Sequence, residues 1–286
     1  MKTIVALGNF DAIHVGHIKI INETVKIAKQ NGAIPVLFTF DGDLSAYLGK
    51  SLGVAFTQNE KLIKIKKYGI EKVIFAPIND SFLSKTKEEF LTWLDEQVEV
   101  LGYVCGDDFS FGLKAEGNVL YLKEYAEKNG KILSVISEVL FNKERASTTK
   151  LKEYLKLGEM QLVTNLLGGE DYFISGTVVS GRGKGKTIGF PTVNLAFSNE
   201  KFPIKEGVYA GYTYIDDKKY KVVINYGNAP TFDFNDKVLE FFILDYSGDL
   251  YGKNLTVYFT KFLRKIKKFL NVDELKNQIE KDVNSL

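Results

Sequence analysis

The stretch GRGKGKTIGFPTVNL, residues Gly181 to Leu195, holds four glycines, two lysines, one arginine and one proline. Glycines let a backbone turn its N–H groups toward an anion, and the basic residues supply counter-charge. A P-loop is excluded, because Ser180 stands where that motif has its first glycine. Pro191 removes a backbone donor and disfavours helical geometry at Phe190, so we expect extended chain to follow. The stretch predicts a phosphate-handling loop in a β-structure; the alternative is a hairpin with a solvated basic tip.

The residues before this stretch indicate a domain boundary. A helical pattern ends in Gly168-Gly169, and from Tyr172 the apolar residues recur with a period of two. We therefore expect a first domain over residues 1–168 and a second over residues 169–286.

The second domain reads as an antiparallel β-barrel. The period and the short polar turns predict strands over Phe173–Val179, Val208–Ile215, Tyr220–Asn225, Leu239–Asp245 and Leu255–Phe262. A final amphipathic helix should follow, with Asp273 as its N-cap and with Leu275 and Ile279 on one face.

The first domain alternates short apolar runs with helical periodicity. The expected strands are Thr3–Leu7, Ile34–Thr39, Lys72–Ala76, Tyr103–Cys105 and Ile132–Ile136. The expected helices are Ile18–Lys29, Asn59–Lys67, Lys87–Val98 and Val119–Lys128. This alternation predicts an α/β fold with a doubly wound parallel sheet. Ligands of such sheets bind beyond the carboxyl ends of the strands, which is where residues 8–17 should lie.

Composition limits the function classes. The chain has 286 residues, 45% apolar content and a net charge of +2, so global charge favours neither a nucleic-acid partner nor a membrane partner. Cys105 is the only cysteine, which excludes an internal disulfide and a cysteine-rich zinc site. The chain also lacks a long apolar span. We expect a cytoplasmic protein, and the sequence leaves its oligomeric state open.

Both histidines of the chain, His14 and His17, fall in the loop after the first strand. One could cap the following helix, and a metal pair is a second possibility, although the chain offers no third histidine to complete a zinc site. Two histidines confined to one loop at the ligand-binding edge of a sheet favour a functional role.

The second domain resembles riboflavin kinases, which carry a basic glycine-rich loop followed by Gly-Phe-Pro-Thr-x-Asn. Here that motif is residues 189–194, and residues 207–211, 225–232 and 239–252 resemble later kinase segments. The resemblance implies that Thr192 and Asn194 hold Mg²⁺ with ATP phosphates, which suits a metal that prefers oxygen ligands. It also implies ATP or flavin binding by Gly181, Lys186, Gly189, Pro191, Asn225 and Arg264. Ile266 departs from the family, which commonly has glutamate there.

Glu240 corresponds to the catalytic base in this resemblance. It is the one charged residue in the run Leu239–Ile243. A carboxylate that takes the proton of the ribityl 5′-hydroxyl would suit phosphoryl transfer from ATP. The alternative is a strand residue on a solvated face.

The first domain is similar to the nucleotidyltransferase superfamily through GNFDAIHVGH, residues 8–17, which matches Gly-x-Phe-Asp-x-x-His-x-Gly-His. The resemblance implies that His14 and His17 stabilise a triphosphate during attack on the α-phosphorus. It further implies nucleotide or flavin binding by Gly8, Asn9, Phe10, Asp11, Gly16, Asp108, Ser147, Thr148 and Lys152. More narrowly, residues 106–112 and 147–158 resemble the adenylyltransferase module of prokaryotic bifunctional enzymes that make FMN and then FAD.

Two departures from this module bear on its activity. Thr39-Phe40-Asp41 continues as Gly-Asp-Leu, where the family usually has Pro-His-Pro. Lys152 replaces an arginine, which keeps the charge but loses the planar fork that grips two phosphate oxygens.

The function expected from these motifs is bifunctional: riboflavin and ATP give FMN in the second domain, and FMN and ATP give FAD in the first. Two alternatives remain open. One is a riboflavin kinase with a degenerate first half, and the other is a flavin or nucleotide sensor that binds without turnover. Riboflavin, FMN and ATP are the expected partners, with Mg²⁺ as the expected cofactor.

Overall fold

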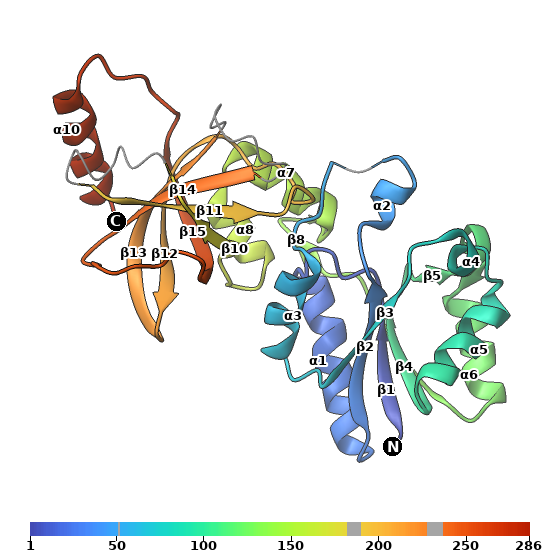
Figure 1. The fold of residues 1–286 in the computed structure, drawn as a ribbon. Helices are drawn as coiled ribbons and strands as arrows, with labels where there is room; N and C mark the ends of the chain where they lie inside the picture. The colour runs from blue at the N-terminus through green and yellow to red at the C-terminus, as the bar shows by residue number, and fades with distance from the viewer. Residues whose placement is uncertain (51, 182–189, 228–236) are drawn as a thin grey trace. The chain divides into compact units, whose positions relative to one another are not determined.

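The computed structural model describes residues 1–286 except 51, 182–189 and 228–236 (Figure 1). The chain divides into two compact units, Met1–Thr148 and Thr149–Leu286. Each unit is built on its own sheet, one open and parallel, the other closed and antiparallel. The boundary expected between residues 168 and 169 stays a prediction; in the division above, residues 149–168 fall in the second unit.

The first unit contains a five-stranded parallel sheet in the order β3-β2-β1-β4-β7. Its strands are β1 (Thr3–Leu7), β2 (Ile34–Phe40), β3 (Lys72–Ala76), β4 (Val100–Gly106) and β7 (Ile132–Ile136). The order reverses between β1 and β4, because the chain proceeds from β1 to one side of the sheet and later returns to fill the other side. The loops after β1 and β4 therefore meet at a topological switch point, the usual ligand site of such sheets.

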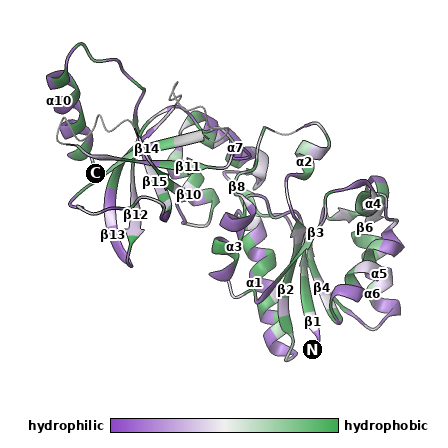
Figure 2. Ribbon diagram, in the orientation of Figure 1, coloured by the Kyte–Doolittle hydropathy of each residue, from purple (hydrophilic) through white to green (hydrophobic). Residues whose placement is uncertain are grey.

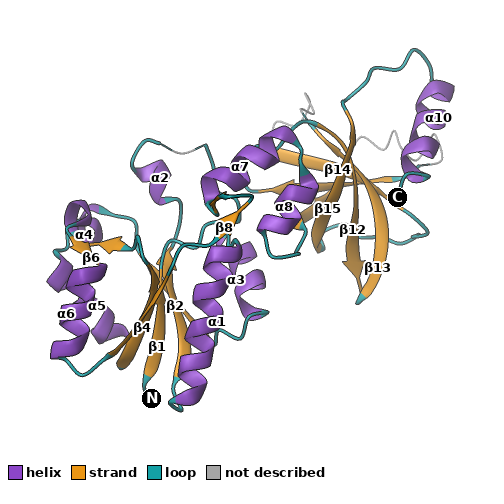
Figure 3. Ribbon diagram, turned by 180° about the vertical axis from the view of Figure 1, so that it is seen from behind, coloured by secondary structure: helices purple, strands orange, loops and turns teal. Residues whose placement is uncertain are grey.

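Helices cover both faces of this sheet (Figure 3). They are α1 (Val15–Gln30), α3 (Gln58–Lys66), α4 (Asp80–Leu83), α5 (Lys87–Gln97) and α6 (Val119–Lys128). Alternate residues of β1 pack into two separate hydrophobic cores, one on each face of the sheet. Ile4 and Ala6 pack with α1, whereas Val5 and Leu7 pack with α5 and α6. The strands consequently read as continuous apolar runs, as is usual for a sheet buried on both faces (Figure 2).

Short elements complete the first unit around the carboxyl ends of the strands. They are α2 (Leu44–Tyr47), β5 (Ser110–Phe111), η1 (Leu113–Ala115), β6 (Gly117–Asn118), β8 (Leu140–Phe141) and β9 (Glu144–Arg145). β5 pairs with β6, and β8 pairs with β9, each pair antiparallel.

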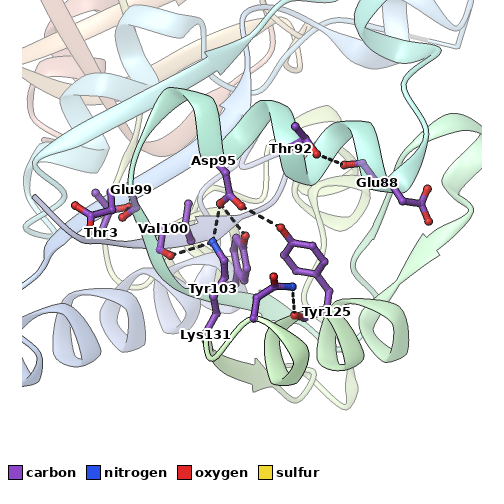
Figure 4. A network of polar contacts seen from close by, with 10 residues as sticks. Thr3, Glu88, Thr92, Asp95, Glu99, Val100, Tyr103, Tyr125 and Lys131 are labelled. Carbon is purple, nitrogen blue, oxygen red and sulfur yellow. Dashed lines mark hydrogen bonds and ion pairs between the residues drawn. The ribbon is translucent and has the colours of Figure 1, made fainter.

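At the amino ends of the strands, away from these short elements, a polar network joins α5, α6 and the sheet (Figure 4). Asp95 accepts from Lys131 Nζ at 2.8 Å and from the hydroxyl of Tyr125 at 3.0 Å. Lys131 Nζ also donates to the carbonyl oxygen of Val100 at 3.0 Å, so one ammonium group ties the start of β4 to the end of α5. Half-buried charges that are paired in this way stabilise a fold more than exposed pairs do.

We expect Lys131→Met to lower the free energy of unfolding by about 1.5 to 3 kcal/mol, because it removes a charge-assisted bond and leaves Asp95 with one partner fewer. The matched control is Lys123→Met, at an exposed lysine of α6, which should change stability by less than about 0.5 kcal/mol. Urea unfolding of both variants measures the difference. Equal losses in the two variants would show that the network contributes nothing specific.

The second unit is a closed six-stranded antiparallel barrel in the order β10-β11-β14-β13-β12-β15. Its strands are β10 (Tyr172–Val179), β11 (Thr192–Phe197), β12 (Gly207–Ile215), β13 (Lys218–Tyr226), β14 (Lys237–Ile243) and β15 (Asn254–Arg264). Inward residues such as Leu239, Phe241 and Val257 are buried and fill the barrel. Asp216 and Asp217, both at positive φ, form the two-residue turn between β12 and β13.

Among the described residues of this unit, the helices beside the barrel are α7 (Thr148–Leu157), α8 (Met160–Leu166) and α10 (Val272–Val283). α8 packs against β10 and β15, and α10 packs against β13. The N-cap of α10 is Asn271, whose side chain accepts from the N–H of Glu274 at 2.9 Å. The expectation of Asp273 as N-cap was therefore wrong by two residues, because Asn271 offers an equally good acceptor earlier in the chain.

Candidate active sites

A cavity of about 950 Å³ opens at the switch point of the parallel sheet. The loops that follow β1, β4 and β7 line it, together with the N-terminus of α1 and residues 145–148. The expectation that residues 8–17 lie beyond the carboxyl ends of the strands is thus confirmed. Gly8, Asn9, His14, Gly16, His17, Asp108, Ser147 and Thr148, all candidates from the sequence, line this one cavity.

Phe10 and Asp11 belong to the same loop but not to the cavity lining. Phe10 is fully buried at φ 48°, and its ring contacts that of His17 with centroids 4.9 Å apart. Asp11 is also buried and accepts from the N–H of Ala55 at 3.0 Å. A non-glycine residue in the left-handed region is held there only by its surroundings. Phe10 and Asp11 therefore fix the loop, and any direct binding role for them stays a prediction.

His14 is the N-cap of α1. Its Nδ1 accepts from the N–H of Gly16 at 3.2 Å, so a neutral ring carries its proton on Nε2. Burial, and then the nearby Arg145, lower the pKa of His14 to about 4. Near neutral pH in the absence of ligand, His14 is an uncharged hydrogen-bond donor at the cavity wall.

His17 stacks on His14, with ring centroids 3.9 Å apart and an interplanar angle of 19°. Burial, and then electrostatic interaction with His14 and Lys61, hold the pKa of His17 well below its usual range. Its Nδ1 is buried and has no hydrogen-bond partner among the described residues. Two stacked neutral imidazoles beside the N-terminus of a long helix suit an anion that brings negative charge with it.

These depressed pKa values make the stability of the first unit depend on pH. The unfolded chain binds more protons than the folded chain between about pH 6.5 and pH 4, so the free energy of unfolding should fall as the pH falls through this window. The slope should approach about 1.4 kcal/mol per pH unit for each histidine. His14→Asn keeps an N-cap but cannot titrate. Urea unfolding at pH 7 and pH 5 should show a smaller loss in this variant; an equal loss would contradict the assignment.

Arg145 is a functional candidate that the sequence reasoning missed. It lines the cavity from β9, and its guanidinium lies 2.8 Å from Asp108 Oδ1 and 3.3 Å from Asp107 Oδ1. Asp108, which the sequence predicts to bind ligand, thus forms an ion-pair cluster with Arg145 and Asp107. A guanidinium beside two carboxylates and near His14 can hold or release an incoming phosphate.

The segment that departs from the Pro-His-Pro pattern forms part of the cavity wall. Asp43 caps α2 by accepting from the N–H of Ser45 at 2.9 Å, and Leu44, Tyr47 and Leu48 line the cavity. The hydroxyl of Tyr47 donates to Asp80 of α4, which also raises the pKa of Tyr47. In this chain the departing segment therefore forms a short capped helix at the cavity wall.

Lys152, the second departure, lies in α7 with its Nζ 5.8 Å from the ring centroid of Phe202. It falls in the second unit of the chain, whereas Ser147 and Thr148 fall in the first. The role of Lys152 toward a nucleotide stays a prediction.

A second group of candidate site residues, here called the barrel constellation, lies on the outer face of the barrel. Glu240 of β14 is directly opposite Asn194 of β11 on one side and Asn225 of β13 on the other. The hydroxyl of Thr192 donates to Glu240 Oε1 at 2.6 Å. Leu239 and Phe241, the neighbours of Glu240 in the chain, point into the core, so the period of two places Glu240 outward. Four of the candidate residues thus share one face of three adjacent strands.

Gly181 leaves space for this constellation. A Cβ at Gly181 would lie 2.0 Å from Asn194 Nδ2, and Val179, two residues earlier, is the strand partner of Asn194. Pro191 is exposed and directly precedes β11, and Phe190 packs edge-on against Phe242 with centroids 5.3 Å apart. Lys186 and Gly189 lie outside the described residues.

We expect Gly181→Ala to displace the Asn194 amide and to lower phosphoryl transfer by on the order of 10- to 100-fold, because small misplacements of site groups are costly. The double variant Gly181→Ala/Asn194→Ala should be no slower than Asn194→Ala alone, since both changes remove the same oxygen. Steady-state kinetics of the three variants tests this. Additive losses would mean that Gly181 acts by another route.

The side chain of Arg264 forms an ion pair within the second unit. Its guanidinium binds the carboxylate of Asp282 in α10, with Nε–Oδ1 at 3.0 Å and a terminal nitrogen 2.7 Å from Oδ2. Asp282 is buried, and Gln278 also donates to it at 3.0 Å. This bidentate pair anchors the last helix to the end of β15. The flavin or nucleotide contact expected of Arg264 stays a prediction.

Comparisons with known proteins match both units. The FAD synthetase family model covers residues 1–150, and the riboflavin kinase family model covers residues 168–286. The chain belongs to the bifunctional riboflavin kinase/FMN adenylyltransferase family. A bifunctional riboflavin kinase/FMN adenylyltransferase of Haemophilus influenzae is 32% identical, with 97% of this chain and 91% of the relative covered. The corresponding protein of Buchnera aphidicola subsp. Schizaphis graminum is 31% identical, with 98% and 91% covered.

One solved structure matches nearly the whole chain. A crystal structure from Streptococcus pneumoniae aligns with a TM-score of 0.87 and 27% identity, over 99% of this chain and 93% of that one. Its title describes a macrolide-efflux protein. Among the described residues of the present chain, no helix is long and apolar enough to cross a membrane. As a family member, the chain is expected to use a divalent metal with ATP.

Proposed function

We infer that the protein is a bifunctional flavin-cofactor enzyme that phosphorylates riboflavin to FMN and adenylylates FMN to FAD, with ATP as co-substrate in both reactions. The observation that carries this inference is the presence of two separate constellations, each within the matching family segment: the stacked histidines at the switch-point cavity and the Glu240 cluster on the barrel.

The barrel constellation supports phosphoryl transfer. Thr192 holds Glu240 through Oε1, and no described residue bonds Oε2. We assign Oε2 to accept the proton of the ribityl 5′-hydroxyl while the oxygen of that hydroxyl attacks the γ-phosphorus of ATP and ADP leaves. General-base catalysis of this kind contributes about 10² to 10⁴ in rate.

The same constellation fits a magnesium ion. A hydroxyl oxygen at Thr192, an amide oxygen at Asn194 and the open space provided by Gly181 form a small set of hard ligands, which leaves room for water and phosphate oxygens. When bound, Mg²⁺ would neutralise charge on the β- and γ-phosphates. Among the described residues, no group of three or more His, Cys, Asp or Glu side chains forms a metal site.

The switch-point cavity supports adenylyl transfer. A phosphate oxygen of FMN attacks the α-phosphorus of ATP, the α–β bridging bond breaks, and pyrophosphate leaves. His14 offers an Nε2–H donor, and the N-terminus of α1 offers backbone N–H groups to the triphosphate. We assign His17 and Arg145 to stabilising the charge that develops on the leaving pyrophosphate.

The inference is tested by incubating the protein with riboflavin, ATP and Mg²⁺ and separating the flavins over time. FMN should appear first and FAD should follow. Accumulation of FMN with no FAD, even when FMN is supplied directly, would favour a kinase with an inactive first unit. Binding of flavin or nucleotide without formation of FMN or FAD would favour a sensor that binds these ligands without turnover. Cytoplasmic location is part of the proposal and rests on the sequence alone.

A further inference from the structure

A groove of about 730 Å³ lies on the outside of the barrel, within the second unit. β12, β13 and β15 form its floor, and the turn between α7 and α8 and the end of the chain form its walls. Its lining includes four lysines, Lys205, Lys219, Lys221 and Lys261, against the carboxylates of Glu159 and of Leu286 at the end of the chain, a formal charge of +2. A chain with a net charge of only +2 thus concentrates positive charge in one hollow.

Strand pairing explains why the lysines converge. Lys221 of β13 is directly opposite Tyr212 of β12, and Lys261 of β15 is opposite Ala210 of the same strand. Lys219 precedes Lys221 by two residues and therefore points to the same face. Neighbours across a sheet lie only about 5 Å apart, so the pairing collects ammonium groups that are distant in sequence.

Aromatic rings, a carbonyl group and a carboxylate hold three of these lysines in place. Lys219 Nζ lies 3.7 Å from the ring centroid of Tyr212, and Lys205 Nζ lies 4.2 Å from that of Phe262. Lys205 Nζ also donates to the carbonyl of Leu157 at 2.9 Å, and Lys221 Nζ donates to a terminal carboxylate oxygen of Leu286 at 2.9 Å. Long side chains that are already ordered lose less entropy when they bind a ligand. The four ammonium groups outnumber the two carboxylates of the lining, so a further anion would be attracted to the groove.

We propose that this groove binds a phosphate-bearing small molecule through Lys205, Lys219, Lys221 and Lys261. Tetrahedral phosphate oxygens fit several point-like ammonium donors, and lysine serves phosphate in this way elsewhere. Asn225 of the Glu240 cluster lies on the same face of β13 as Lys221, four residues further along, a separation of about 13 Å. The groove is therefore separate from the barrel constellation but close enough to receive the phosphorylated compounds handled there.

The test compares two variants of the full chain that lose the same charge. The groove variant is Lys219→Ala/Lys221→Ala/Lys261→Ala. The control is Lys253→Ala/Lys268→Ala/Lys281→Ala, at exposed lysines outside the groove lining. Titration calorimetry with pyrophosphate, and separately with FMN, measures affinity and stoichiometry, and circular dichroism checks the fold.

We expect the groove variant to lose one binding event, or to bind at least about tenfold more weakly, while the control matches the parent protein. A preference for pyrophosphate or for FMN identifies the source of the phosphate. Unchanged binding in the groove variant would overturn the proposal, and so would equal weakening in both variants, which would indicate a general charge effect. If the triple variant is unfolded, Lys219→Gln/Lys261→Gln is tested by the same criteria. Basal FMN formation from riboflavin reports on the proposed function independently of this result.

Discussion

Glu240→Gln should lower the rate of FMN formation from riboflavin by roughly 10² to 10⁴-fold, because the amide cannot take the proton of the attacking hydroxyl. Glutamine keeps the shape of the side chain and can still accept from Thr192 Oγ1, which donates to Glu240 at 2.6 Å. Riboflavin binding should therefore survive. Adenylylation of added FMN should be unchanged, since that reaction is assigned to the other unit.

The measurement is kcat for both half-reactions, together with the affinity for riboflavin. Thr192→Val provides the comparison: it keeps the base but removes both the bond that orients it and a hydroxyl oxygen assigned to Mg²⁺, so excess Mg²⁺ should recover part of its loss and none of the loss in Glu240→Gln. Near-normal FMN formation by Glu240→Gln would remove this residue from the role of base.

His17→Ala should abolish measurable FAD formation, with an expected loss of about 10² to 10³-fold or more, while sparing FMN formation. The variant removes a ring that stacks at 3.9 Å on His14 and contacts Phe10 at 4.9 Å, so both a transition-state group and a support of the loop are lost. His17→Asn tests the role of His17 in the transition state, because the asparagine side chain can still donate a hydrogen bond. Partial recovery of FAD formation in His17→Asn would fit the assignment.

Circular dichroism and the rate of FMN formation control for folding of the His17 variants. FAD formation by His17→Ala at a rate close to that of the parent protein would contradict the assignment of His17 to adenylyl transfer.

The architecture could be predicted from the sequence because its signals are local. Continuous apolar runs such as Thr3–Leu7 and Lys72–Ala76 are strands of the parallel sheet, and the period of two after Tyr172 is the barrel. Pro191 correctly predicted extended chain, which is β11. The ends of elements were less certain, because side chains such as Asp273 and Asn271 compete as caps and only tertiary packing decides between them.

The sites were predictable only as sets of residues. Motifs named Thr192, Asn194 and Glu240, but their adjacency depends on the register between β11 and β14, which local patterns do not encode. Arg145 carried no signal, because a charged residue in a two-residue strand looks like any surface position until it meets Asp107 and Asp108.

Arg264 illustrates the opposite difficulty. Its motif suggested a ligand contact, whereas its observed partner, Asp282, stands eighteen residues away in a helix that could have packed elsewhere. A buried carboxylate needs such a partner, so this arginine has a structural task whatever it does toward ligand.

The central claim is that two independent sites act in sequence, and mixing the two variants tests it most directly. Glu240→Gln alone should convert riboflavin to FMN and FAD only at the roughly 10² to 10⁴-fold lower rate of its kinase reaction, and His17→Ala alone should stop at FMN. A mixture of the two, given riboflavin, ATP and Mg²⁺, should make FAD, because FMN released by one variant is the substrate of the other. Failure of the mixture to form FAD, although each variant retains its assigned half-reaction, would contradict the account, as would FAD formation from riboflavin by either variant alone at a rate close to that of the mixture.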